Sequence, residues 1–216
     1  MKLAVFDCDG TLIDGQASIC AAMEQAFGEF GLPLPPRNDI RRAVGLSLPQ
    51  AIRILLPGAD TEQHLALTEA YKRAFRAARQ SGELQQPLFV GIAPLLDDLR
   101  SAGWLLGVAT GMSRRGLDHC LATHGLTGHF ITLQTADNHP SKPHPAMLEA
   151  ALLEAGAEPR HAVMIGDTVF DMHMAGSAGV HGIGVEWGYH APQELIAAGA
   201  ASVAANPAQL GEILGL

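Results

Sequence analysis

Two pairs of carboxylates in this chain each follow a short apolar segment. Residues 3–6 lead directly into Asp7-Cys8-Asp9-Gly10-Thr11. Asp7 and Asp9 face the same side of an extended chain, because strand residues two apart share a face, and Gly10 lets the backbone turn away from them. Paired carboxylates can transfer protons or bind a divalent cation. Their position at the end of a buried strand indicates an active site, since parallel sheets bind ligands beyond the carboxyl ends of their strands.

The second pair follows another apolar segment, residues 162–165. Here Gly166 leads into Asp167, and Asp171 comes four residues later. Asp167 has the same position as Asp7, at the end of an expected strand. Asp171 admits two interpretations, because a spacing of four residues is one helical turn. It is either part of the same site or a first-turn charge that is favourable to the helix dipole.

Two further segments carry groups that bind anions. The apolar residues 104–109 end in Thr110-Gly111, where a hydroxyl and a backbone N–H can donate to phosphate oxygens. Lys142 lies in Ser141-Lys142-Pro143-His144-Pro145, and the prolines stiffen the backbone around it. A charge held in this way suits an anion or a cluster of carboxylates. The alternatives are a plain strand-to-helix turn at Thr110 and a rigid surface loop around Lys142.

The elements that position these residues alternate between strands and helices, except in one long helical stretch. Helical periodicity continues from residue 16 to about residue 82 with no strand between. From Phe89 onward strands and helices alternate, which is typical of a doubly wound parallel α/β sheet. We therefore expect an α/β core of residues 1–14 and 88–216, with residues 15–87 inserted after the first strand as a helical cap.

Local signals predict where several elements begin. Asn38 or Asp39 can cap a short helix, and Thr61 can cap a longer one. Ser47 with Gln50 three residues later matches a capping box. The strands expected after the first cover residues 104–109, 130–133, 162–165, 180–186 and 201–204.

Composition limits the class of protein. The 216 residues are 48% hydrophobic and 17% charged, and the formal net charge is -8. We expect no binding of nucleic acid or of anionic membranes, because both require a basic surface. Cys8, Cys20 and Cys120 show no spacing for disulfides or zinc, which fits a reducing cytoplasm. No segment has the length and apolar character of a transmembrane helix.

The segments around Asp7, Thr110, Lys142 and Asp167 resemble, in order, the four motifs of the haloacid dehalogenase superfamily. The helical insert lies between the first and second motifs, which is where the first cap class of that superfamily lies. The resemblance covers nearly the whole chain and is strongest to the phosphoglycolate phosphatase-like branch. It implies a Rossmann-like α/β core with a helical cap. It also implies a Mg²⁺-dependent phosphatase whose partner is a small phosphorylated metabolite.

The resemblance implies a role for each of these residues. Asp7 is the nucleophile that forms an aspartyl-phosphate, and Asp9 protonates the leaving alcohol and then activates water. Mg²⁺ is bound by Asp7, the main-chain carbonyl of Asp9, and Asp167. Asp171 orients the third catalytic residue, Lys142, or the bound waters. The implied phosphate-binding groups are Lys142, the Thr110 hydroxyl and the backbone N–H groups of Cys8, Asp9 and Gly111.

Two other functions are compatible with the same motifs. A β-phosphoglucomutase-like phosphotransferase shares all four and differs in its cap contacts, and a catalytically silent binding module can be built on the same fold. None of the aspartates is missing, which favours an enzyme, and Asp9 argues against a dehalogenase, which has no leaving alkoxide to protonate. The substrate and the oligomeric state are left open. The sequence also does not decide whether Arg41, Arg42 or Arg53 contacts the substrate.

Overall fold

A six-stranded parallel sheet forms the centre of the computed structural model, which describes residues 2–216. Its strand order is β3-β2-β1-β4-β5-β6, and every neighbouring pair is parallel. The chain therefore has the doubly wound α/β fold that was predicted. The strands are β1 (Lys2–Phe6), β2 (Trp104–Thr110), β3 (Thr132–Thr135), β4 (Ala162–Gly166), β5 (His181–Val185) and β6 (Ser202–Ala204).

The central strand β1 is apolar throughout because helices cover both faces of the sheet. Leu3 and Val5 belong to the hydrophobic cluster on one face, and Ala4 and Phe6 belong to the cluster on the other. All four side chains are fully buried. Such a strand reads as a continuous apolar run without alternation, as is usual for parallel sheets.

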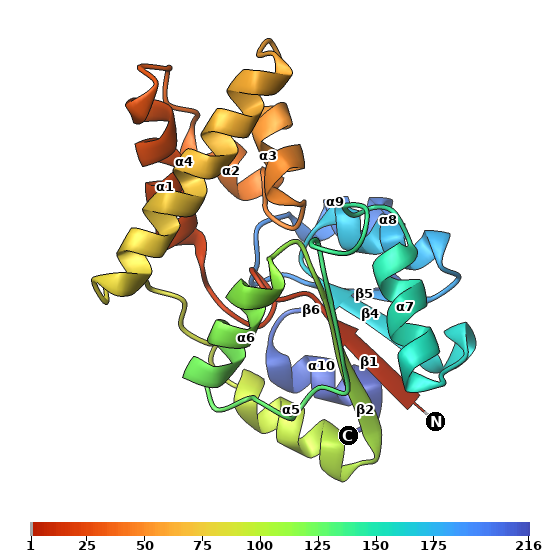
Figure 1. Cartoon of the computed structure of the whole chain (residues 1–216). Coiled ribbons are helices and arrows are strands. Elements are labelled where there is room, and N and C mark those ends of the chain that lie inside the picture. Colours follow the sequence, from red (N-terminus) through yellow and green to blue (C-terminus); the bar gives the residue numbers. More distant parts are fainter. Residues whose placement is uncertain (1) are drawn as a thin grey trace.

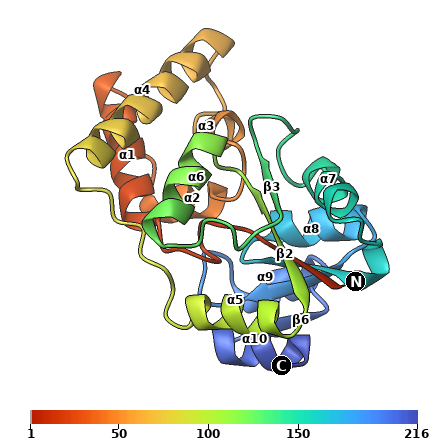
Figure 2. The ribbon, with the colours of Figure 1, turned by 60° about the horizontal axis from the view of Figure 1, so that its bottom comes forward.

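Helices lie on both sides of the sheet, and Figures 1 and 2 show this three-layer arrangement from two directions. On one side, α5 and α6 contact β2 and β3, and α10 contacts β6 and α5. On the other side, α7, α8 and α9 contact the sheet. Their bounds are α5 (Ile92–Ser101), α6 (Arg114–Thr123), α7 (Ala146–Ala155), α8 (Val169–Ser177), α9 (Pro192–Ala197) and α10 (Pro207–Leu214), with a 3₁₀ turn at Pro159–His161.

Four further helices lie between β1 and β2 and stand apart from the sheet at the upper left of Figure 1. They pack on one another around a hydrophobic cluster of their own, which includes Met23, Phe27, Ile52 and Leu67. This unit corresponds to the helical insert expected after the first strand, while the proposed domain boundaries stay a prediction. The helices are α1 (Gln16–Glu29), α2 (Arg37–Ala43), α3 (Leu48–Leu55) and α4 (Thr61–Gln80).

The chain enters and leaves this helical unit, called the cap below, at neighbouring points. The Asp14 N–H donates to the carbonyl of Pro87 at 2.8 Å, and Ile13 and Leu88 form an antiparallel bridge. The two connecting segments therefore run side by side. No helix within residues 2–216 has the length and apolar character needed to span a membrane.

Two of the predicted helix caps are wrong, one helix start is right without its side-chain bond, and the strand bounds differ by up to two residues. Neither Asn38 nor Asp39 caps α2, because the residue before this helix is Pro36. The α4 cap is Asp60 instead of Thr61, and its carboxylate accepts from the backbone of the third helical residue at 2.8 Å. Ser47 does precede α3, but its side chain makes no capping hydrogen bond. The third strand begins at residue 132, two residues later than predicted.

Candidate active site

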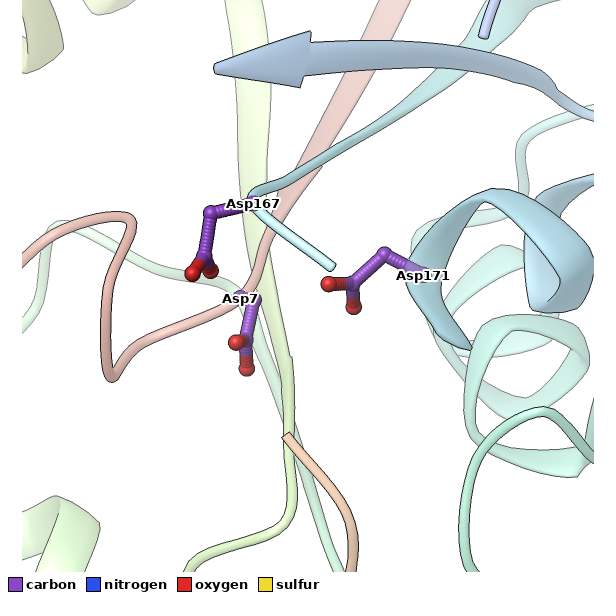
Figure 3. A group of neighbouring side chains, drawn as sticks. All are labelled: Asp7, Asp167 and Asp171. Carbon is purple, nitrogen blue, oxygen red and sulfur yellow. The ribbon is translucent and has the colours of Figure 1, made fainter. Parts of the chain in front are cut away.

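The carboxyl ends of β1 and β4 are adjacent at the centre of the sheet, where the strand order reverses. Asp7 follows β1, Asp167 follows β4, and the Asp7 N–H donates to the Ile165 carbonyl at 2.8 Å. Asp171 comes from the first turn of α8 and points toward the other two carboxylates in Figure 3. An oxygen of each of the three carboxyl groups lies within 4.8 Å of the others. Ligands bind at this kind of switch point in open α/β sheets.

Lys142 neutralises part of this acidic cluster. Its Nζ lies 2.7 Å from Asp7 Oδ1 and 2.7 Å from Asp171 Oδ1. All three side chains are buried, with 1% or less of each side chain exposed. Burial by itself lowers the pKa of Lys142, but the carboxylates of Asp171 and Asp7 raise it above the ordinary lysine value. Lys142 therefore stays charged, and the interpretation of a rigid surface loop is wrong.

Asp171 serves both functions that the sequence left open. Its Oδ1 accepts from Lys142 at 2.7 Å. Its Oδ2 accepts from the Thr168 hydroxyl at 2.7 Å and from the Thr168 N–H at 3.1 Å, which completes a capping box at the start of α8. The helix start thus holds the carboxylate that in turn holds the lysine.

Asp167 is fixed from two directions. Its Oδ1 accepts from the Thr11 hydroxyl at 2.9 Å, and its Oδ2 accepts from the Tyr189 N–H at 2.9 Å. The backbone must approach closely here, since a Cβ on Gly10 would collide with the Asp167 carboxyl group. Gly10 has φ = 89°, so its lack of a side chain serves both the turn and this contact.

Two buried carboxylate oxygens at the site accept no hydrogen bond within residues 2–216. They are Asp7 Oδ2 and Asp9 Oδ1, while a third such oxygen, Asp7 Oδ1, has only its ion-pair contact with Lys142. Burial raises the pKa of Asp7 to about 6, an effect that Lys142 opposes. Burial, followed by the charge of Asp7, raises the pKa of Asp9 to about 7. Asp9 is therefore largely protonated just below neutral pH, which is the state that a proton donor requires.

This donor set fits a hard divalent cation. Buried carboxylate oxygens without partners are costly unless a cation or proton compensates them, and Mg²⁺ prefers oxygen ligands. Asp7 and Asp167 each bring an oxygen to the cluster, and their role as metal ligands stays a prediction. The Asp9 side chain is not part of the cluster, and the role of its main-chain carbonyl as a ligand stays a prediction.

A cavity of about 530 Å³ opens between these carboxylates and the cap. Asp7 and Asp9 form part of its wall, and so do Thr110 and Gly111 at the end of β2. The Thr110 side chain is buried, and its hydroxyl accepts from the Met112 N–H at 3.2 Å. The four motifs therefore meet at one place, with Lys142, Asp167 and Asp171 packed beside the residues that line the cavity.

Cys8 lies on the opposite side of the β1 end from its two aspartate neighbours. Its side chain is fully buried in the hydrophobic cluster that α5 and α6 share. Cys120 of α6 belongs to the same cluster. The side chain of Cys8 thus packs in the core, as strand alternation predicts, and only its backbone N–H remains a candidate phosphate ligand.

The cap arginines that the sequence brought forward do not line the cavity. Arg42 forms a two-pronged ion pair with Glu194 of α9, and its shorter contact is 2.7 Å. Arg53 donates to Gln50 within its own helix at 3.2 Å. Arg41 is also absent from the cavity wall.

Other side chains, which were not among the candidate site residues predicted from the sequence, form the far wall of the cavity. They include Tyr71, Phe75, Arg76 and Arg79 of α4, together with Arg115 of α6. Tyr71, Phe75 and Arg79 are spaced by four residues, and this spacing could have placed them on one face of the helix. Arg115 carries no such signal, because only the tertiary fold brings α6 to the cap.

Comparison with known proteins identifies the family. A family model described as haloacid dehalogenase-like hydrolase matches residues 4–185. The chain belongs to this family. This hydrolase is 35% identical over 201 residues to "Probable phosphatase IndB" of Dickeya dadantii, an alignment that spans 91% of the chain and 86% of the relative. The resemblance inferred from the four motifs is confirmed.

Two further relatives cover almost the full length. A phosphoglycolate phosphatase of Vibrio vulnificus is 26% identical over 224 residues, spanning 99% of this chain and 96% of that protein. The crystal structure of a hydrolase from Pseudomonas syringae has a TM-score of 0.87 and is 27% identical, covering 99% of this hydrolase and 98% of that chain. Core and cap together therefore match full-length members of the family.

Proposed function

We propose that this hydrolase is a Mg²⁺-dependent phosphatase that hydrolyses a small phosphate monoester through an aspartyl-phosphate. The observation that carries the proposal is the buried cluster of Asp7, Asp167 and Asp171 with Lys142, placed beside a cavity between the core and the cap. The names of the relatives, a phosphatase and a phosphoglycolate phosphatase, support this activity.

Asp7 is proposed as the nucleophile. Its Oδ2 accepts no hydrogen bond and is free to bond to phosphorus, while Lys142 holds Oδ1 at 2.7 Å and fixes the carboxylate. As the new O–P bond forms, the bond from phosphorus to the alcohol oxygen breaks. Asp9 gives its proton to that oxygen and later removes a proton from the water that cleaves the aspartyl-phosphate. Its pKa of about 7 allows both directions of transfer near neutral pH.

Asp7, Asp167 and the main-chain carbonyl of Asp9 would hold the cation. When bound, Mg²⁺ supplies positive charge that lets an anionic nucleophile approach an anionic phosphate. Charge balance supports the assignment, since three ionised aspartates face one lysine and one divalent cation. Thr110, Gly111 and the backbone N–H groups beside Asp7 would bind the phosphate oxygens as charge develops on them.

Hydrolysis is favoured over phosphotransfer by the cap side of the cavity. The cap residues there are mainly apolar, including Ile19, Met23, Ile40 and Leu55, and the charged ones are confined to α4. A mutase must hold a sugar bisphosphate while the bisphosphate turns around, which requires a dense set of polar contacts. An apolar wall supplies few such contacts but excludes bulk water from the reacting groups.

The test is Mg²⁺-dependent release of phosphate from a panel of small phosphate monoesters. We expect chelation to abolish release, Mg²⁺ to restore it and Asp7→Asn to remove turnover while the protein stays folded. Asp98→Asn is the matched control, because Asp98 is exposed on α5 and does not line the cavity. Release that survives exhaustive chelation, or predominant isomerisation of a sugar 1-phosphate supplied with a trace of bisphosphate, would contradict the proposal.

A further inference from the structure

One face of α4 carries a continuous ladder of two aromatic rings and an arginine. Tyr71, Phe75 and Arg79 are spaced by four residues, and all three line the cavity. The rings of Tyr71 and Phe75 stack with centroids 5.7 Å apart and an angle of 22° between their planes. The guanidinium of Arg79 lies 5.8 Å from the centroid of the Phe75 ring. These three residues are called the α4 ladder below.

The ladder leads from the catalytic end of the cavity to its outer end. Tyr71 is close enough to Asp9 for the carboxylate charge to add to burial in raising the pKa of the Tyr71 phenol. Arg79 is eight residues further along the helix, and a rise of 1.5 Å per residue places it about 12 Å from Tyr71. Arg79 therefore lies next to Arg115 of α6, at the far end from the aspartates.

Arg79 has no anionic partner among the residues that the structure describes. Its Nε is buried and makes no hydrogen bond within residues 2–216, and in that range no carboxylate lies within ion-pair distance of Arg76, Arg79 or Arg115. The carboxylate of Asp137 also lines the cavity, but its Oδ2 accepts from the backbone of α6 at 2.7 Å. Arg79 and the more exposed Arg76 and Arg115 thus line one cavity without an ion-pair partner among residues 2–216, which is an arrangement suited to an incoming anion.

The space between the aspartates and these arginines is apolar. Besides the two rings, its wall is made by side chains from α1, α2, α3 and the loop before α3. They are Ile19, Met23, Ile40, Val44, Leu46, Leu48 and Leu55. A volume of about 530 Å³ is in the range of pockets for drug-sized ligands and exceeds what a two-carbon phosphate ester fills.

We infer that the substrate of this enzyme is a phosphate monoester with an apolar, preferably aromatic, body and a second anionic group at its far end. The body stacks against Tyr71 and Phe75, while Arg79, assisted by Arg115, binds the distal carboxylate or phosphate. The inference rests on the proposed function and narrows its substrate class. It also assigns Arg79 as a specificity-determining residue.

The test compares two esters that differ only in distal charge. One is an aryl phosphate with a carboxyethyl group para to the phosphate, and the other carries the neutral carboxamide in place of the carboxylate. We expect kcat/KM of the native enzyme to favour the carboxylate at least tenfold, mainly through KM. In Arg79→Met, which keeps an unbranched stem over Phe75, the preference should fall below about threefold.

Arg73→Met is the matched control. Arg73 lies on the same helix but is exposed and pairs with Glu29 at 2.6 Å, so the preference for the carboxylate should be retained. Equal kcat/KM for the two esters in the native enzyme, or a preference that survives Arg79→Met, would overturn the inference.

A binding measurement separates this inference from the proposed function. Both esters are titrated calorimetrically into the Asp7→Asn variant with Mg²⁺ present, so that no turnover is needed. A tenfold tighter binding of the carboxylate ester supports the inference even if the native enzyme hydrolyses neither ester, a result that would contradict only the proposed function. Equal binding of the two esters would contradict the inference, whatever the activity.

Discussion

Lys142 is charged and lies in the interior of the protein, where a charge without a partner is most costly. The lysine and its two carboxylate partners, Asp7 and Asp171, are all buried. Removing one member of a buried ion pair leaves the other without compensation, which typically costs more than the pair contributes. Loss of Lys142 leaves two carboxylates unpaired, whereas loss of Asp7 leaves Lys142 paired with Asp171, so the two changes should have very different effects.

Lys142→Met should destabilise the protein by about 3 kcal/mol, because two buried carboxylates then face each other without a cation. Asp7→Asn should instead stabilise the metal-free protein, on the order of 2 kcal/mol at pH 7. Folding raises the pKa of the Asp7 carboxyl group from 3.8 to about 6. The free energy of unfolding of the native protein therefore falls as pH rises through that window. The gain from Asp7→Asn should thus shrink toward pH 4. Urea unfolding in a chelator measures both variants, and a destabilised Asp7→Asn protein at pH 7 would refute this account.

Asp9→Asn should lower kcat by roughly two to four orders of magnitude for alkyl phosphates, the usual share of general acid–base catalysis. Aryl phosphates with good leaving groups should lose less, since their departing oxygen needs less protonation. Rates for a series of esters with graded leaving-group pKa values check this. A loss of equal size across the series would count against Asp9 as the proton donor.

At the scale of the elements, the cap and the core meet at several specific contacts. The Ser47 N–H donates to Ser141 Oγ at 2.8 Å, and a Cβ on Gly111 would collide with the Leu46 carbonyl. His190 Nε2 lies 3.2 Å from the Arg42 carbonyl. These contacts bring the loop before α3 directly over the phosphate-binding turn.

The ion pair of Arg42 and Glu194 joins α2 to α9 and should make cap docking sensitive to acid. The hydrogen bonds from Arg42 lower the pKa of Glu194 from 4.5 to about 2. A carboxylate with a depressed pKa contributes stability above pH 4.5, and this contribution is lost as pH falls toward 2. We expect Glu194→Gln to lower Tm by roughly 1–2 °C at pH 7, less at high salt, with the difference smaller at pH 3 and vanishing near pH 2. Glu158→Gln, in a local pair with Arg160, is the control, and an unchanged difference at pH 3 would refute the prediction.

The sequence was sufficient for the order of the elements and for the four motifs, because both depend on local patterns. Apolar runs ending in Asp7 or Asp167 are visible without tertiary contacts. The choice between Asp60 and Thr61 as a cap is not, since both side chains can accept the same hydrogen bond and only the geometry of the preceding loop decides. Ser47 fails as a side-chain cap although its spacing is right, and its backbone instead bonds Ser141, 94 residues away.

The cavity wall was hidden for a related reason. Helical periodicity identifies the buried face of α4. It does not distinguish an aromatic ring at the edge of a hydrophobic cluster, where the ring can line a cavity, from a ring inside the cluster. Tyr71 and Phe75 indeed pack against the cap cluster while also lining the cavity. Sequence alone cannot place Arg115 beside Arg79, because 36 positions separate them and the intervening chain crosses from cap to core.

At the scale of the whole molecule, the cavity lies between two parts of the chain and is walled by both. Such a site admits ligands that fit between the core and the cap and disfavours those whose phosphate is attached to a long polymer. We therefore expect hydrolysis of small phosphate monoesters and, at equal concentration, at least a hundredfold lower kcat/KM for phosphopeptides of ten or more residues. Phosphate release from both measures this, and comparable values would show that the cap does not enclose the substrate.

The paired segments at Asp14 and Pro87 have a consequence for how such a protein can diversify. Because the insert departs and returns at hydrogen-bonded neighbours, its length imposes no strain on the sheet, and different inserts can be exchanged by recombination without altering the catalytic strands. Substrate range and chemistry can then evolve separately. A chain in which a short glycine-serine turn replaces residues 17–84 should still fold as the parallel sheet. Its circular dichroism and cooperative unfolding would reveal whether the core folds without the cap.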